Sequence, residues 1–120
     1  MTLRSFRDLE VWQLAMELTD LVYVASLDFA HPHRLELGGQ MREASVSVPS
    51  NIAEGDRQRS KKAYIRYLNI SARSLAELET QVEIASRRQI ARPEESAQMA
   101  SLCDRVGRML NVLITRLSSS

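Results

Sequence analysis

The chain has 120 residues, which is the size of one domain, and its 16 Lys plus Arg nearly balance its 15 Asp plus Glu. The molecule as a whole is therefore not a polycation of the kind that coats nucleic acid. Its single cysteine, Cys103, excludes an internal disulfide framework and a cysteine-based zinc site. With only four Gly and three Pro, the composition favours helix over sheet. We expect one domain over residues 1–120.

The sequence predicts a cytoplasmic protein with no membrane partner. Charged residues interrupt every apolar run well before the roughly 20 residues that a membrane-spanning helix needs. The first ten residues mix Arg4 and Arg7 with Asp8 and Glu10, whereas a secretory signal places an uninterrupted apolar block after a cationic stretch.

Apolar residues recur at helical spacing in four stretches, and each stretch predicts one amphipathic helix. Short connections make neighbouring helices antiparallel, so the pattern predicts an all-α, up-down-up-down four-helix bundle. The four predicted helices cover residues 9–28, 35–56, 61–90 and 93–117.

The second helix is the least regular of the four. Residues 44–48 alternate between small or polar and apolar side chains like a strand, and Pro49 both disfavours helix for Val48 and removes a hydrogen bond to the carbonyl of Ser45. Local propensity therefore favours a break here. A lone strand, however, would have no partner elsewhere in the chain, which favours helix.

Several segments resemble one known family. They are Phe6–Gln13 (FRDLEVWQ), Ser47–Gly55 (SVPSNIAEG), Ser74–Gln81 (SLAELETQ) and Val106–Leu110 (VGRML). The sequence is similar over Phe6 to Leu117 to the four-helix bundle proteins encoded as intervening sequences inside bacterial large-subunit ribosomal RNA genes, a family that also includes accessory proteins of diversity-generating retroelements.

The resemblance has implications for structure and function. It implies a left-handed bundle in which the segment around Pro49 is helical, and a ring of five subunits. It implies no established enzymatic activity, while the retroelement accessory proteins bind nucleic acid and a reverse transcriptase. The central family motif supplies four candidate structural residues: Pro49, Asn51, Glu54 and Gly55.

The residue types needed for catalysis or metal binding do not occur in suitable arrangements. The two histidines, His31 and His33, flank Pro32 in a predicted loop, so no helix carries the Glu-x-x-His pairs of a di-iron bundle. Cys103 has Asp104 beside it and is predicted to be a buried thiol rather than a nucleophile. We expect no enzyme, no cofactor, no metal site and no small-molecule substrate.

A cluster of basic residues precedes and enters the third predicted helix. No acidic residue occurs between Arg57 and Ala76, and on a helix Lys62, Arg66 and Arg73 share one stripe, with Tyr67 near its edge. Such a stripe is a candidate site for the phosphate backbone of RNA or DNA. The candidate nucleic-acid-binding residues are Arg57, Arg59, Lys61, Lys62, Arg66 and Arg73.

The same charges have a structural interpretation. The first helix carries Glu17, Asp20 and Asp28 and no Lys or Arg between Val11 and Ala30. Opposite charges on the first and third helices can pair within the bundle or between subunits, or can simply be solvated.

Asn51 falls near the apolar face of the second helix, and a buried Asn needs hydrogen-bond partners. One interpretation is that it orients the packing of the second and third helices, as a polar core residue does in coiled coils. The alternative is a ligand pocket at the Pro49 kink, where the freed Ser45 carbonyl and Asn51 would converge.

Aromatic residues outside the main apolar stripes favour self-association. Trp12, Tyr23 and Tyr67 are the candidate interface residues, since exposed aromatic surface is typical of interfaces. Alternatively, Trp12 only caps the end of the bundle. The sequence therefore predicts a non-enzymatic scaffold that forms a homo-oligomer, with a nucleic-acid-binding accessory protein as the alternative.

Overall fold

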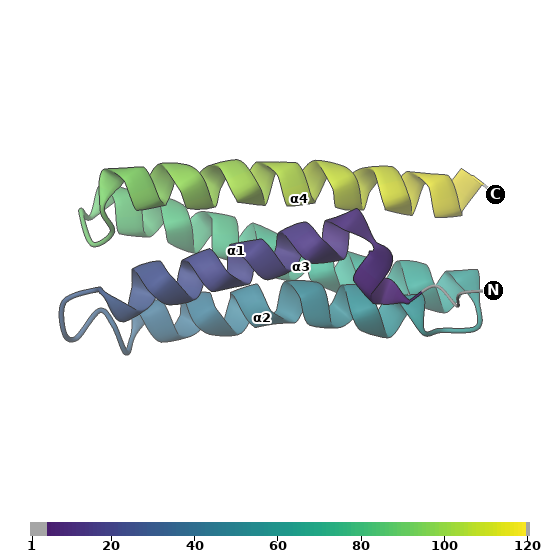
Figure 1. The fold of residues 1–120 in the computed structure, drawn as a ribbon, viewed down its shortest axis with the longest axis horizontal. Helices are drawn as coiled ribbons and strands as arrows, with labels where there is room; N and C mark the ends of the chain where they lie inside the picture. The colour runs from purple at the N-terminus through teal and green to yellow at the C-terminus, as the bar shows by residue number, and fades with distance from the viewer. Residues whose placement is uncertain (1–4, 120) are drawn as a thin grey trace.

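The protein is an all-α four-helix bundle, as the spacing of apolar residues predicted. The computed structural model describes residues 5–119, and within that range every regular element is helical (Figure 1). A short 3₁₀ helix, η1, precedes the bundle. The elements are η1 (Phe6–Asp8), α1 (Glu10–Leu27), α2 (Leu37–Asp56), α3 (Lys61–Arg87) and α4 (Pro93–Ser119).

The helices form a square in cross-section. Consecutive helices pack against each other and α4 returns to pack against α1, whereas the backbones of the diagonal pairs, α1 with α3 and α2 with α4, lie farther apart. In Figure 1 the helices run alternately in opposite directions along an elongated molecule of 47 × 27 × 21 Å. Helices α1 and α3 therefore run in the same direction and lie on opposite sides of the bundle.

Each helix buries the apolar stripe that its sequence carries. Leu18, Ile52, Leu68 and Met99, one from each helix, have no exposed surface. Cys103 packs among them with 1% exposure, which agrees with the predicted buried thiol. Since a fully buried Leu or Met contributes about 1.5–3 kcal/mol, these stripes account for the association of four helices of differing propensity.

Five helix ends differ from the sequence-based boundaries by one to three residues, and turns explain two of these differences. Helix α2 begins at Leu37 rather than at residue 35, because residues 31–36 form turns. Helix α3 ends at Arg87 rather than at residue 90, because Gln89 has φ 57° and the chain reverses there. The N–H groups of Gln89 and Ile90 bond back to the carbonyls of Ser86 and Ala85, so this turn satisfies the last carbonyls of α3 without glycine.

Helix α2 continues through Pro49, so the interpretation of residues 44–48 as a strand is wrong. Pro49 has no N–H to donate to the carbonyl of Ser45. The hydroxyl of Thr19 on α1 donates to that carbonyl instead, at 2.9 Å, and shares its one proton with the carbonyl of Ala15 at 3.0 Å. On the other side, the hydroxyl of Ser71 on α3 donates to the carbonyl of Val48 at 2.9 Å. Neighbouring helices thus supply the hydrogen bonds that keep this segment helical.

Candidate functional site

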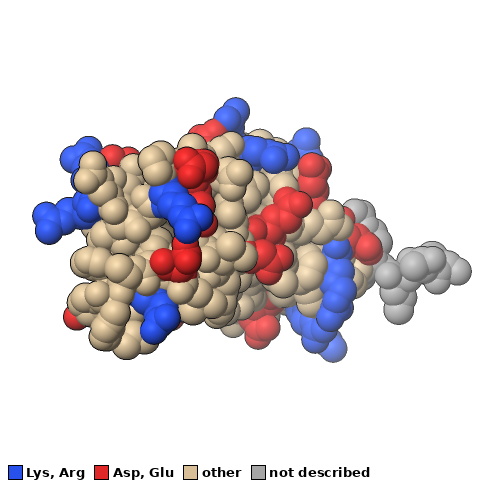
Figure 2. Space-filling model, turned by 60° about the vertical axis from the view of Figure 1, so that its left-hand side comes forward, with Lys and Arg blue, Asp and Glu red and all other residues tan. Residues whose placement is uncertain are grey.

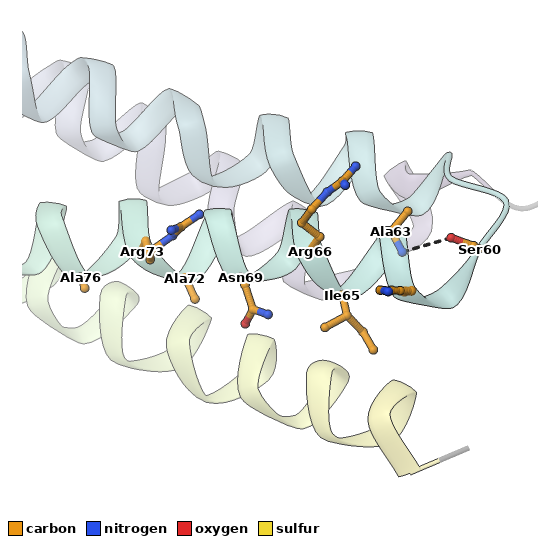
Figure 3. A pocket seen from close by; sticks show the side chains of 9 residues that line it. Ser60, Ala63, Ile65, Arg66, Asn69, Ala72, Arg73 and Ala76 are labelled. Carbon is orange, nitrogen blue, oxygen red and sulfur yellow. Dashed lines mark hydrogen bonds between the residues drawn. The ribbon is translucent and has the colours of Figure 1, made fainter.

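A basic groove lies along the outer face of α3. It has a volume of about 840 Å³, and no acidic side chain is among its described lining residues. Figure 3 shows that Ile65 and Asn69 point toward α4, while Arg66 and Arg73 extend from the opposite side of α3, toward α2. The lining residues are Ser60, Lys62, Ala63, Ile65, Arg66, Asn69, Ala72, Arg73 and Ala76.

Local interactions position the basic groups of this groove. The hydroxyl of Ser60 accepts a hydrogen bond from the N–H of Ala63 at 3.1 Å, so Ser60 is the N-cap of the helix. The guanidinium of Arg66 lies 5.5 Å from the centre of the Tyr67 ring, so that ring supports it from the α2 side. Tyr67 itself is half-buried against Gly55 of α2.

The structure divides the six predicted basic residues into two groups. Lys62, Arg66 and Arg73 line the groove, as their spacing on one helical stripe predicted. The other three do not line it. Arg57 and Arg59 lie in the connection between α2 and α3, with the guanidinium of Arg57 5.4 Å from the Phe6 ring centre, and Lys61 is the first residue of α3.

The acidic residues of α1 lie on a different side of the molecule. Glu17 and Asp20 line a second groove, of about 590 Å³, between α1 and α4, with Leu21 and Leu102 as apolar neighbours and Arg105 on the α4 side. Figure 2 shows acidic side chains across the middle of one face of the molecule, with most of the basic ones nearer its edges.

Pairing of α1 with α3 inside the bundle is ruled out, because these two helices are diagonal. Among residues 5–119, Asp28 at the C-terminal end of α1 pairs with Arg92, at 2.8 Å, and Arg92 precedes α4 rather than belonging to α3. Glu17 and Asp20 of α1 and Lys62, Arg66 and Arg73 of α3 are exposed and therefore face outward on separate sides of the bundle.

Asn51 belongs to a hydrogen-bond network between α2 and α3. Its side-chain amide donates to the carbonyl of Ser47 at 2.8 Å and to the Ser47 hydroxyl at 3.0 Å. That hydroxyl shares a 2.7 Å hydrogen bond with the hydroxyl of Ser74 on α3. The Thr19 hydroxyl lies within hydrogen-bond distance of the Ser45 carbonyl, and the Asn51 amide donates to Ser47, so both groups have partners inside the bundle. These partners favour the structural interpretation of Asn51 over a ligand pocket at Pro49.

Replacing Asn51 with alanine should reduce stability without affecting surface binding. The loss of its two hydrogen bonds is expected to cost about 0.5–1.5 kcal/mol, which corresponds to roughly 2–6 °C in Tm. Thermal unfolding followed by circular dichroism measures it. Asn69→Ala makes the same chemical change at an exposed position and should leave Tm nearly unchanged. An Asn51→Ala protein with unaltered Tm and altered ligand binding would contradict this structural role.

Two titratable side chains, the buried Cys103 and the half-buried Tyr64, have raised pKa values. Burial, with a smaller contribution from the nearby Glu79 carboxylate, raises the pKa of the Cys103 thiol to about 12, so the thiol stays protonated at neutral pH. Burial and then Asp56, whose carboxylate lies 3.3 Å from the Tyr64 hydroxyl, raise the pKa of Tyr64 to about 12. Within the described part of the chain, no group of three or more His, Cys, Asp and Glu could hold a metal ion.

The predicted interface residues have different environments. Trp12 is half-buried and packs edge-on against Phe6 at 5.3 Å, which fits a cap at the end of the bundle. Tyr67 is half-buried at the α2–α3 contact. Tyr23 is exposed, and it belongs to a larger apolar set on the outside of α1, whose other members the sequence reading missed: Met16, Val24 and Leu27.

The signal for this set was present in the sequence. Met16, Tyr23 and Leu27 are spaced by seven and four residues, so they form a second apolar stripe on the helix face away from the core. Asp20 lies beside this stripe, whereas Glu10 and Glu17 lie roughly 100° around the helix from it, and Glu17 lines the groove toward α4. The exposed surface of α1 therefore has an apolar part and an adjacent acidic part. None of the helices between residues 5 and 119 combines the length and apolar character that crossing a membrane requires.

Comparison with known proteins identifies the family. The chain superposes with a TM-score of 0.79 on the crystal structure of a protein with unknown function from the S23 ribosomal protein family of Bacteroides thetaiotaomicron, at 19% sequence identity, covering 88% of this chain and 95% of that one. This likeness shows a shared fold. No curated protein matches the chain. Residues 7–112 match the family described as 23S rRNA-intervening sequence protein, which is most of the bundle, and the chain therefore belongs to this family.

Proposed function

We propose that this protein is a non-enzymatic scaffold whose copies assemble into a closed ring, a homopentamer as the family resemblance implies. The observation that carries the proposal is the outer face of α1. Half of the large apolar side chains that are exposed among the described residues, Met16, Tyr23, Val24 and Leu27, lie on this one helix. Apolar surface gathered on one face, rather than scattered singly, is typical of association sites.

Presenting a surface to other molecules is the role that we propose for this scaffold. The buried Cys103 and the half-buried Tyr64 have pKa values raised to about 12, so neither supplies a nucleophile or a base near neutral pH. A ring would instead present repeated copies of its remaining outer surface to a macromolecular partner.

Self-assembly is tested by light scattering coupled to size exclusion at micromolar concentration. We expect a single species with five times the 13.6 kDa mass of the chain. The mass should hold over a tenfold dilution if the interface is stable. A 13.6 kDa monomer at micromolar concentration would contradict the scaffold proposal.

A nucleic-acid-binding accessory role is the second candidate, and the basic groove of α3 favours it. Lys62, Arg66 and Arg73 share this groove without an acidic residue among its described lining, and Arg66 and Arg73 lie about 10 Å apart along the helix axis, close enough to contact one phosphate backbone. The role would resemble that of the retroelement accessory proteins, with RNA or DNA bound on the outside of the bundle.

Titration of fluorescent double-stranded DNA and of single-stranded RNA between 50 and 200 mM salt tests this role. Three cation–phosphate contacts predict that log K falls with log salt at a slope of about −2.7 on duplex DNA. Replacing Arg66 or Arg73 with Gln should each reduce the slope by about 0.9, whereas Arg34→Gln, at the exposed turn before α2, should not. Failure to bind either nucleic acid at 50 mM salt would contradict the role.

A further inference from the structure

We propose that adjacent copies in the ring dock the outer face of α1 on one copy onto the basic groove of α3 on the next, with the two helices parallel and in register. The occupant of the basic groove is thus a second copy of this chain. This inference rests on the proposed self-assembly, and it names the two surfaces that meet.

The two surfaces are complementary in charge. Glu10 and Glu17 lie on the exposed side of α1, and Arg66 and Arg73 lie on the exposed side of α3. None of these four residues forms an ion pair with another residue between 5 and 119. Because α1 and α3 are diagonal in the bundle, the opposite charges can meet only between molecules.

Hydrogen bonds inside the bundle show that the charges lie at matching heights. Thr19 of α1 bonds to Ser45 of α2, and Ser47 of α2 bonds to Ser74 of α3. Ser45 precedes Ser47 by two residues on α2, and α3 runs antiparallel to α2, so Ser45, and with it Thr19, lies level with residue 76 of α3. Glu17 then lies level with residue 74, so its height along the bundle axis differs from that of Arg73 by about one residue rise, ~1.5 Å.

The spacing of the charges repeats this match. Glu10 precedes Glu17 by seven residues, and Arg66 precedes Arg73 by seven residues, while both helices run in the same direction. Glu10 therefore lies at the height of Arg66, just as Glu17 lies at the height of Arg73. A rotation about an axis parallel to the helices preserves these heights, so both pairs form together between neighbours in a ring.

The apolar side chains extend the match beyond the charges. By the same count Leu27 of α1 is level with Ile84 of α3, and these two side chains are 52% and 43% exposed. Their contact would remove apolar surface from water at the end of the interface farthest from Glu10. We expect the apolar contacts to supply affinity and the charged pairs to set partner and register.

The contact joins two different faces, so it generates a ring or an open helix rather than a two-fold dimer. Glu17 also lines the groove between α1 and α4, so the acidic part of α1 is turned toward α4 and the two docking faces are not diametrically opposite. Successive copies are then related by a rotation, which curves the assembly toward closure.

Charge reversal tests the interface. Arg66→Glu with Arg73→Glu, or Glu10→Lys with Glu17→Lys, places like charges opposite each other at every contact, and each double variant should fall from the ring mass to 13.6 kDa. The chain with all four substitutions has both faces reversed, restores opposite charges at every contact, and should recover the ring mass. Circular dichroism verifies that each variant stays helical.

The control is Arg34→Glu with Arg88→Glu, which changes the net charge as much as the Arg66 and Arg73 reversal does but at the loop end of the bundle, and it should keep the ring mass. A wild-type protein that is already monomeric would refute the proposed self-assembly itself. A wild-type ring that survives either double reversal, or a four-fold variant that stays monomeric while folded, would refute this interface alone. If the Arg66 and Arg73 reversal abolishes nucleic-acid binding and leaves the ring mass unchanged, the groove binds nucleic acid rather than a second copy, and this interface is refuted.

Discussion

Replacing Gly55 with alanine should lower the free energy of unfolding by about 1–3 kcal/mol, although alanine is the better helix former. A Cβ at this position would lie 2.9 Å from Cδ1 of Tyr64, 3.0 Å from Cβ of Tyr67 and 3.2 Å from the carbonyl oxygen of Tyr64. Two of these atoms belong to the backbone or its first side-chain carbon, which cannot move unless α3 shifts away from α2. Urea unfolding followed by circular dichroism measures the change.

Gly39 in the same helix provides a matched control. A Cβ there would meet only the flexible end of the Arg42 side chain, at 4.0 Å. Gly39→Ala should therefore raise the free energy of unfolding by about 0.5–1 kcal/mol through helix propensity alone. If both substitutions stabilise the protein, the close contact between α2 and α3 at Gly55 is not as described.

Thr19→Val should cost about 1–3 kcal/mol even though the two side chains have nearly the same shape. The Thr19 hydroxyl donates to the carbonyl of Ser45 at 2.9 Å, and that carbonyl lacks its usual intrahelical donor because residue 49 is proline. Ser45 is 1% exposed, so water cannot replace the lost donor. The free energy of unfolding in urea measures the cost.

A double-mutant cycle with Pro49→Ala isolates this mechanism. Alanine at position 49 restores a backbone N–H that donates to the Ser45 carbonyl, so in that background Thr19→Val should cost about 1 kcal/mol less than it does beside the proline. Thr80→Val provides the control, because the Thr80 hydroxyl bonds to the carbonyl of Ala76 on an exposed surface. Equal costs of Thr19→Val in both backgrounds would show that Thr19 does not compensate for Pro49.

These contacts connect the interior to the proposed assembly. The hydroxyls of Thr19 and Ser74 attach α1 and α3 to the central α2, and so they set the relative heights of the two outer faces. A shift of either helix by one turn, about 5.4 Å, would move Glu17 away from the height of Arg73. Hydroxyl-bearing side chains between the helices thus fix the helix register, and the register fixes the relative heights of the surface charges.

The sequence by itself determined the fold class, the four helices and the burial of Cys103, because the spacing of apolar residues reports which side of a helix leaves water. It also placed Lys62, Arg66 and Arg73 on one stripe, since residues on one helix share a known geometry. It placed the start of α2 two residues too early, within the turns of residues 31–36. It placed the end of α3 too late, because the turn at Gln89 satisfies the last carbonyls with a non-glycine residue in the left-handed region.

Only the tertiary structure decided how the helices relate to one another. The helical state of residues 44–49 depends on a donor from Thr19, 26 residues away in the chain, and local propensity contains no information about such a partner. The same holds for the separation of the acidic face of α1 from the basic groove of α3, and for the matching heights of Glu17 and Arg73. These properties follow from which helices are neighbours and at what register they pack, and both are set by side chains that meet only after the chain has folded.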